Sequence, residues 1–544
     1  MKKIHFLCLL LLLPFIGSAQ NKKAKKAFAL GYIYYSQGML SESIDNFTLA
    51  IKLYPKYSDA YLMRGCAYDR NKEYEKGSDD FAQVIKFEPR NFVGYYNRGV
   101  AEQALNDTSA AFRDFTKSIE LNNTYSNSFN NRGIIYLEHE QLPQAYSDLK
   151  RATVLDPYSD TAFYNLARTE YIMHEEENAL QHISNAVRMN QKNADFVAYK
   201  GFIELKLQDS ISALVDFEKA IVLDPSHIVA HEGHYLICIE RKKYKSARED
   251  LDFLIRTKPL NTIYLSDRSY LNFLENRYEE SLTDINKAIS ICPDSAHYYN
   301  KRGNLFLQWE RYEESLADFT KASQLMPDYF GYWYNKALVK YNMELLEEAL
   351  PDIDKSIQLN DSFANAYFCR GKIKIYLADE ESGIADYEKG VSLNPFNAYS
   401  YSNFAYILLE IGENEHALQT INKAIALDTL NAKFMLQRAY IYSALDKKAN
   451  ALSDCNKVIA LDKKSAEAYY TRAYFNRMFS KYTAAISDYT SVIELNENYH
   501  QAYYYRGICW YSLGNYAKAG DDFRAALKLD PDNRTYKASL NQLK

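Results

Sequence analysis

Apolar residues recur along this chain at helical spacing, in pairs of segments separated by a short polar turn. In residues 58–91, for example, Tyr61 and Tyr68 lie on the apolar face of one segment, and Phe81 and Phe87 lie on that of the next. Spacing of this kind predicts two amphipathic α-helices joined by a turn. Because the pattern continues almost to the C-terminus, it predicts an all-α chain of tandem helix pairs.

The helix pairs repeat with a period of 34 residues, which two columns of small side chains show. The first column runs in steps of 34 from Gly31 to Gly507, and thirteen of its fifteen members are Gly or Ala. The second column, from Ser43 to Ala519, is Ala, Gly or Ser at all fifteen positions. Nine repeats also carry a proline near their end, where it stops the second helix. The small columns allow neighbouring helix backbones to approach closely.

The order aromatic, Gly, Tyr, Ala, aromatic, Ala, Pro within each repeat resembles the tetratricopeptide repeat family. This resemblance implies a right-handed superhelical solenoid of helix-turn-helix repeats, with the first helices lining a concave groove. We expect fifteen repeats without insertion or deletion: 24–57, 58–91, 92–125, 126–159, 160–193, 194–227, 228–261, 262–295, 296–329, 330–363, 364–397, 398–431, 432–465, 466–499 and 500–533. Residues 20–23 form a short lead, and residues 534–544 are expected to cap the end of the array with a one-sided helix. No stretch remains for a separate catalytic domain.

The N-terminus resembles a secretory signal peptide. Two lysines follow Met1, an apolar run extends from Ile4 to Ile16, and small residues precede Gln20. The run is too short for a spanning helix, although an uncleaved anchor is the alternative. We therefore expect residues 1–19 to be removed and the mature protein to work in the periplasm or outside the cell, with no integral membrane segment left.

Composition narrows the classes of function. The net charge of −5 excludes a polybasic nucleic-acid binder, so no nucleic-acid partner is expected. The six cysteines beyond the N-terminal segment are far apart and form no CxxC pair, so we expect buried thiols and neither disulfides nor a zinc finger. The 49 tyrosines are unusual, and many fall at the fourth, eleventh and seventeenth positions of the repeat, so packing explains much of the surplus.

A basic residue at the seventh repeat position varies together with an acid sixteen residues later. In eleven repeats the pairs are Arg64 with Asp80, Arg98 with Asp114, Arg132 with Asp148, Lys200 with Asp216, Arg268 with Asp284, Arg302 with Asp318, Lys336 with Asp352, Arg370 with Asp386, Arg438 with Asp454, Arg472 with Asp488 and Arg506 with Asp522. In three repeats the seventh residue is apolar and the partner is not acidic: Leu30 with Asn46, Leu166 with His182 and Phe404 with Thr420. This covariation predicts a contact between the two helices or across neighbouring repeats. The alternative is that these charges form a ladder that binds a charged ligand. Charges that are already paired with each other, however, produce little net electrostatic field to attract a partner.

The family resemblance implies that the second, fifth, sixth, ninth, twelfth and thirteenth repeat positions face the groove. Aromatic residues there, including Tyr334, Phe368 and Tyr406, could anchor a peptide or partner helix, stack on sugars, or simply pack between first helices. The C-terminal cluster of Tyr440, Tyr470, Tyr474, Tyr504 and Tyr511 is our first candidate. A second candidate is Asn97, Asn131 and Asn165, at the sixth position of three consecutive repeats; Asn335 and Asn403 are isolated members. Asn can donate to and accept from a peptide backbone, and this run resembles the asparagine ladder of O-GlcNAc transferase. A solvated Asn on a wet face is the alternative.

The repeat at residues 228–261 is the most irregular. His231, His234 and Cys238 share one helical face, which is compatible with zinc, but no fourth ligand is visible and these are core positions. A degenerate core stripe is the favoured interpretation, so we expect no metal. The chain contains no HExxH, GxSxG or P-loop motif, and we expect no cofactor and no enzymatic activity.

Together these features predict a non-enzymatic scaffold of the cell envelope that binds partner proteins or extended peptides in its groove. A peptide-capturing chaperone or adaptor is the alternative, and a metal-dependent or carbohydrate-binding factor is a weaker one. The family's carboxylate clamp for heat-shock chaperones needs Lys at the fifth position, and no repeat has one. We therefore expect no partner of that class.

Overall fold

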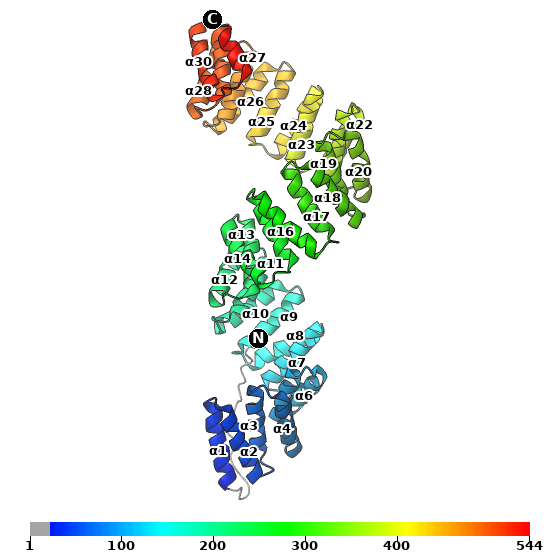
Figure 1. Ribbon diagram of the computed structural model, residues 1–544, viewed down its shortest axis with the longest axis vertical. Coiled ribbons are helices and arrows are strands. Elements are labelled where there is room, and N and C mark those ends of the chain that lie inside the picture. The colour runs from blue at the N-terminus through cyan, green and yellow to red at the C-terminus, as the bar shows by residue number, and fades with distance from the viewer. Residues whose placement is uncertain (1–21, 544) are drawn as a thin grey trace. The chain divides into compact units, whose positions relative to one another are not determined.

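The computed structural model describes residues 22–543, in which every regular element is an α-helix (Figure 1). The expected signal peptide, residues 1–19, lies outside the described residues, as do residues 20 and 21 of the expected lead. None of the helices in the described range combines the length and apolar character needed to cross a membrane. The chain divides into two compact units, one ending at Tyr264 and the other beginning at Leu265.

The helices alternate between first and second members of a pair along the chain (Figure 1). The first helices are α1 (Lys22–Ser36), α3 (Ser58–Arg70), α5 (Phe92–Ala104), α7 (Ser126–Glu138), α9 (Asp160–Ile172), α11 (Ala194–Lys206), α13 (Ile228–Glu240), α15 (Thr262–Leu274), α17 (Ala296–Gln308), α19 (Phe330–Asn342), α21 (Ala364–Tyr376), α23 (Ala398–Glu410), α25 (Ala432–Ala444), α27 (Ala466–Met478) and α29 (His500–Ser512). The second helices are α2 (Leu40–Leu53), α4 (Tyr74–Phe87), α6 (Thr108–Leu121), α8 (Leu142–Leu155), α10 (Glu176–Met189), α12 (Ser210–Leu223), α14 (Tyr244–Thr257), α16 (Tyr278–Ile291), α18 (Tyr312–Leu325), α20 (Leu346–Leu359), α22 (Glu380–Leu393), α24 (Asn414–Leu427), α26 (Lys448–Leu461), α28 (Tyr482–Leu495) and α30 (Tyr516–Leu529). A short helix, α31 (Arg534–Asn541), follows the last pair. The predicted all-α fold of tandem helix pairs is confirmed.

The first column of small residues is opposed by a large side chain sixteen residues later. Gly65 lies against the buried ring of Phe81, so close that a Cβ at Gly65 would lie 2.6 Å from a ring carbon. Gly99 has the same relation to its own phenylalanine, at 2.8 Å. Where the column holds Ala167, the opposing buried side chain is the smaller Ile183. The two helices of a pair are thus held at a close distance by side chains of complementary size.

The turn between the two helices of a pair uses a left-handed backbone conformation. Twelve non-glycine residues have φ between 55° and 65° at this position, among them Ala378. Glycine occupies the same position only at Gly38, Gly412 and Gly514. A side chain with a Cβ is strained at positive φ, so the repeat tolerates a local cost for the sharp turn.

We expect Ala378→Gly to stabilise the α21–α22 turn by about 0.5–1 kcal/mol, since glycine adopts this φ without strain. The matched control is Gly412→Ala in the next turn, where no atom lies within 4 Å of the added Cβ, so that only backbone strain changes. It should destabilise its turn by a similar amount. Urea denaturation and local hydrogen exchange measure both effects, and a loss of stability in the Ala378 variant would contradict the expectation.

The eleven predicted basic–acidic pairs all form within their own helix pairs. Arg302 is typical: its Nε and Nη2 each donate to one oxygen of Asp318, at 2.7 Å. Its Nη1 also donates to Asn286 Oδ1 on the preceding second helix, at 2.6 Å. Asp318 is only 5% exposed, and the Arg302 side chain is 22% exposed. The covariation therefore reports a contact between the two helices of one helix pair. Arg302 Nη1 extends this contact to the preceding helix pair.

At one of the apolar exceptions, an acid and a histidine form a hydrogen-bonded pair in the reverse order. His182 on α10 lies sixteen residues after Leu166, and its Nδ1 lies 2.7 Å from Glu170 Oε2 on α9. The acid is therefore on the first helix and the base on the second. Glu170 is 1% exposed, so the imidazole supplies a partner that the buried carboxylate requires.

The cysteines behave as expected from their sequence spacing. All six described cysteines are free thiols, and Cys66, Cys238, Cys455 and Cys509 are buried. These four are small members of the apolar core, as predicted, whereas Cys292 and Cys369 are only partly buried.

Candidate functional site

A cavity of about 490 Å³ opens between the first helices α19, α21 and α23, and we call it the α21 cavity. Its lining residues are Tyr334, Leu338, Tyr341, Asn365, Phe368, Cys369, Lys372, Tyr387, Asn403, Tyr406 and Ile407. All but Tyr387 come from the three first helices, and most occupy the repeat positions that the family resemblance assigns to the groove. Tyr334, Phe368, Tyr406 and Asn403, which the sequence places in groove columns, meet here.

The wall of the α21 cavity is a short stack of rings. Phe368 lies directly over Gly390 of α22, where a Cβ would come within 2.3 Å of the ring. The Phe368 ring contacts Tyr387 with centroids 5.6 Å apart, and Tyr387 stacks on Phe404 at 5.2 Å with an interplanar angle of 8°. Because Tyr387 and Phe404 are buried, this wall is held in place by the core behind it.

One cation lies on the cavity surface. The Lys372 ammonium is 5.0 Å from the centroid of Tyr341 and 5.8 Å from that of Tyr376, close enough for cation–π attraction. Burial lowers the pKa of Lys372, but contact with the Tyr341 phenol more than offsets it, so the net pKa is raised and the ammonium stays charged. On α23, hydrogen bonding to Glu410 raises the pKa of Tyr406. The cavity therefore presents a fixed positive charge among aromatic rings.

The polar groups of the α21 cavity suit binding more than chemistry. Burial raises the pKa of the Cys369 thiol and of the Tyr334 phenol to about 12, so both keep their protons at neutral pH. The amides of Asn365 and Asn403 are exposed and hydrogen-bonded to no other described residue. Free amides beside aromatic rings can pair with a peptide backbone while the rings take its side chains.

The three consecutive asparagines lie in different surroundings. Asn97 is 5% exposed and its Nδ2 donates to Cys66 Sγ at 3.7 Å. Asn165 is 6% exposed and donates to Asn130 Oδ1 at 3.0 Å, and Asn130 in turn donates to Asn131. Their amides are thus engaged inside the chain, and only Asn131 is half-buried. A role for these three residues in peptide binding stays a prediction.

The five tyrosines of the C-terminal candidate separate into three groups. Tyr440 and Tyr474 have ring centroids 5.9 Å apart, whereas Tyr470 and Tyr504 both contact Tyr505, at 6.3 Å and 5.1 Å. Tyr504 packs on Tyr536 of α31 at 4.7 Å, and Tyr511 lies edge-on to Tyr516 at 5.2 Å. Tyr504 and Tyr511 therefore have structural neighbours of their own, and binding by any of the five stays a prediction.

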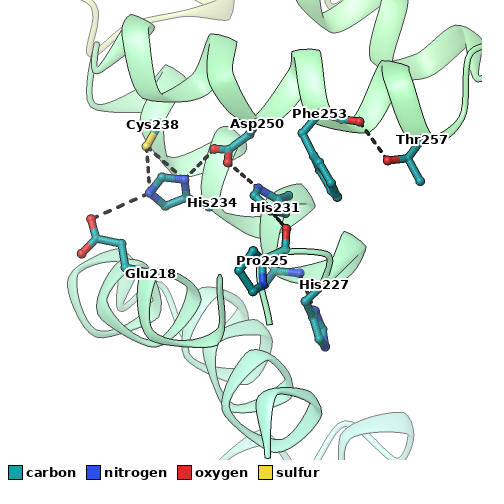
Figure 2. Close-up of polar contacts among 10 residues, drawn as sticks. Glu218, Pro225, His227, His231, His234, Cys238, Asp250, Phe253 and Thr257 are labelled. Atoms are coloured by element: carbon teal, nitrogen blue, oxygen red, sulfur yellow. Dashed lines mark hydrogen bonds and ion pairs between the residues drawn. The ribbon is translucent and has the colours of Figure 1, made fainter. Parts of the chain in front are cut away.

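The irregular repeat contains a carboxylate shared by two imidazoles, as Figure 2 shows. The oxygens of Asp250 on α14 lie 2.6 Å from His231 Nδ1 and 2.5 Å from His234 Nδ1. His234 Nε2 lies 3.5 Å from Cys238 Sγ and 3.8 Å from Glu218 Oε1. Burial lowers the pKa of His234, but the bond to Asp250 outweighs this and raises the net pKa to about 10.

These contacts account for the irregularity without a metal. The Nδ1 atoms of His231 and His234 both face Asp250, and His231 Nε2 lies 3.2 Å from the carbonyl of Pro225. In the part of the chain that the structure describes, no group of three or more His, Cys, Asp or Glu side chains is placed to hold a metal ion. His234 takes the position that Arg or Lys holds in eleven other repeats, so the cluster is a variant of the same ion pair.

Tandem pairs of α-helices, with a cavity between three of the first helices, define this protein as an α-helical repeat protein. Models of the tetratricopeptide repeat match residues 27–57, 58–91, 296–329, 398–429, 432–465 and 500–533. These segments are tetratricopeptide repeats, as the sequence period predicts. Repeats of this family generally serve as non-catalytic scaffolds for binding other proteins.

Several solved structures are similar to this chain. Yeast Tom70 is 15% identical over 79% of this chain and 97% of its own, with a TM-score of 0.38. A tetratricopeptide repeat protein from Parabacteroides merdae is 21% identical over 47% of this chain and 98% of its own, with a TM-score of 0.33. PilF of Pseudomonas aeruginosa is 16% identical over 40% and 98%, with a TM-score of 0.37. No curated protein matches the sequence.

Sequence reasoning missed several residues of these sites. Lys372, Asn365 and Gly390 of the α21 cavity carry no signal by themselves, because their importance depends on the neighbours that surround them. Asp250 was visible as the partner of His234, but its second bond to His231 was not. A search for acids one helical turn after the seventh position would have found Glu170 as the partner of His182.

Proposed function

We propose that this protein is a non-enzymatic interaction scaffold of the cell envelope, which binds partner proteins or extended peptides along its first helices. The observation that carries the proposal is the α21 cavity, where exposed amides, a fixed ammonium and aromatic rings from three first helices converge. Such a surface offers anchors for side chains and hydrogen bonds for a backbone. The envelope location is proposed from the pattern of residues 1–19 alone.

Photo-crosslinking in living cells tests this proposal. We expect p-benzoylphenylalanine in place of Tyr406, which is 52% exposed, to capture a specific partner in the envelope fraction. The matched control places the same group at Tyr158, which is 87% exposed and makes no aromatic contact. Binding of the purified partner should weaken about tenfold when Lys372 and Tyr406 are both replaced by Ala, since two contacts at the centre of the cavity are lost.

The outcomes separate the alternatives. Capture at Tyr158 and not at Tyr406 would contradict binding at the first helices. Capture of many unfolded proteins at Tyr406, instead of one partner, would favour the peptide-capturing chaperone. Recovery of the protein from the cytoplasmic fraction with residues 1–19 intact would contradict the envelope location.

A further inference from the structure

The helix pair formed by α23 and α24 has Phe404 and Thr420 where eleven other pairs have a basic residue and an aspartate. A cavity of about 300 Å³ opens there between α22, α23 and α24, and we call it the Glu388 cavity. Its wall includes Glu388, Tyr401, Phe404, His416, Thr420 and Lys423. It shares no lining residue with the α21 cavity, so the two cavities are separate sites.

The flanking helix pairs show which group fills the corresponding space. Arg370 on α21 donates through Nη1 to Asp354 Oδ1 of α20 at 2.7 Å, sixteen residues before it. Its Nε and Nη2 donate to Asp386 of α22, sixteen residues after it, at 2.8 Å and 2.6 Å. Arg438 on α25 makes the same two kinds of contact with α24 and α26. In both flanking pairs a guanidinium therefore bridges two successive second helices.

The repeat at Phe404 keeps an acceptor for a guanidinium but has no arginine. The residue sixteen before Phe404 is Glu388 and the residue sixteen after it is Thr420, and both line the Glu388 cavity. At Leu166, another apolar exception, the residue sixteen before is the basic Lys150. The Glu388 cavity thus lies where the flanking pairs place a guanidinium, and it retains a carboxylate that can accept hydrogen bonds from one.

The groups around the Glu388 cavity are held in place and available. Phe404 is 2% exposed, stacks on Tyr387 at 5.2 Å and meets His416 edge-on at 5.4 Å. Thr420 is 4% exposed, and its hydroxyl is hydrogen-bonded to no other described residue. The Glu388 side chain is 58% exposed, and its Oε1 lies 3.9 Å from His416 Nε2. A guanidinium in the cavity can donate to Glu388 and Thr420 while it lies beside an aromatic ring.

The wall of the Glu388 cavity also carries a lysine. The Lys423 ammonium lies 5.9 Å from the centroid of Tyr401, and the side chain is exposed. Lys457 holds the same repeat position in the next helix pair, where its Nζ lies 3.2 Å from Asp454 Oδ1. Asp454 also binds Arg438, so a lysine at this position is compatible with a guanidinium nearby.

We infer that the Glu388 cavity binds the guanidinium of an arginine side chain from a partner protein. The inference goes beyond the proposed function, because this site lies between second helices and lies apart from the α21 cavity. A guanidinium is planar, can stack on a ring and presents several donors to a carboxylate, whereas an ammonium is a compact point charge. The chain's own arginines make this contact in the two flanking pairs, and the partner's arginine would make it here.

The test compares three peptides for binding to the full chain by saturation-transfer NMR titration. They are acetyl-Ser-Gly-Arg-Gly-Ser-amide and its counterparts with citrulline, the neutral analogue of arginine, and with Lys in place of Arg. We expect the Arg peptide to bind about tenfold more tightly than the citrulline peptide, with the Lys peptide in between. The preference for Arg should shrink between about 0.02 M and about 0.5 M NaCl, because added salt screens the charge pair.

Glu388→Gln should abolish the preference for Arg, because it removes the charged acceptor and keeps the shape of the side chain. The matched control is Glu381→Gln, which removes another exposed carboxylate of α22 and should leave the preference unchanged. Phe404→Arg with Thr420→Asp should also abolish the preference, since it restores the pair found in other repeats and fills the cavity with the chain's own guanidinium.

Equal binding of the Arg and citrulline peptides by the wild type would overturn the inference, and so would a preference that survives Glu388→Gln. Failure of all three peptides to bind would overturn it as well. Should the double variant not fold, Glu388→Gln decides the question, because that side chain is exposed and its replacement leaves the core intact. The scaffold proposal is decided separately by capture at Tyr406.

Discussion

Asp318→Ala should destabilise the α17–α18 pair by about 3 kcal/mol, the largest single effect we expect, because it leaves the Arg302 guanidinium without its carboxylate. Both oxygens of Asp318 accept hydrogen bonds from Arg302, and the carboxylate is 5% exposed. The bond to Asp318 raises the pKa of Arg302 against the effect of burial. Burial raises the pKa of Asp318 itself, although Arg302 opposes that rise.

The raised pKa of Arg302 favours the charged pair and the raised pKa of Asp318 opposes it, so the complete pair contributes little net stability. Removing only one of the two partners is costly, because the other charge is then left buried without its partner. The guanidinium gains from a carboxylate whose own burial is unfavourable, as is usual for buried ion pairs. We therefore expect the double variant Arg302→Leu with Asp318→Ala to lose only about 1–2 kcal/mol, less than the single variant. The repeat with Phe404 and Thr420 shows that the fold accommodates an uncharged version of this contact.

Local probes are needed because an array of repeats need not unfold as one cooperative unit. Hydrogen exchange in α17 and α18 reports the stability of this pair, and Trp309 at the end of α17 provides a fluorescent signal during urea denaturation. The matched control is Asp521→Ala, which breaks an exposed pair and should have little effect. A single variant as stable as this control, or a double variant less stable than the single one, would show that Asp318 does not stabilise Arg302 in this way.

The second large effect is a loss of stability of the α13–α14 pair as the pH rises. The bond to Asp250 raises the pKa of His234 to about 10 in the folded chain, above the ordinary histidine value of 6.5. The stabilisation is therefore complete below about pH 6.5 and disappears as the pH approaches the folded value. Between about pH 6.5 and about pH 8.5 we expect a decline of about 2 kcal/mol.

His234→Arg should remove this decline, since a guanidinium stays charged throughout the range and restores the pair found in eleven other repeats. The groups that face His234 are Asp250, Cys238 and Glu218, and His231 shares Asp250, so the comparison keeps all of them unchanged. The control is His174→Gln, which alters an imidazole that is 83% exposed and should leave the pH profile as it is. Hydrogen exchange in α13 and α14 across the pH range is the measurement. Identical profiles for the wild type and His234→Arg would contradict the assignment.

Most of the fold could be read from the chain because the repeat is a local pattern copied along it. The period of 34, the column from Gly31 to Gly507 and the proline positions each specify helices and turns through nearby residues. The covariation of residues sixteen apart, as at Arg302 and Asp318, added a true contact between two helices. The covariation was silent about the contact between Glu170 and His182, because a fixed spacing of sixteen cannot detect a partner that lies one helical turn further along the first helix.

The sequence by itself determined the helix pairs, their order and the paired charges, since each of these follows from periodicity over one repeat. Only the tertiary structure decided where the surface is open and which polar groups lack a partner. The α21 cavity depends on Gly390 leaving room for Phe368, and the cluster at Asp250 depends on two imidazoles of α13 that reach one carboxylate of α14. These features arise from the sizes of side chains that meet across helices, and no single position in the repeat encodes them.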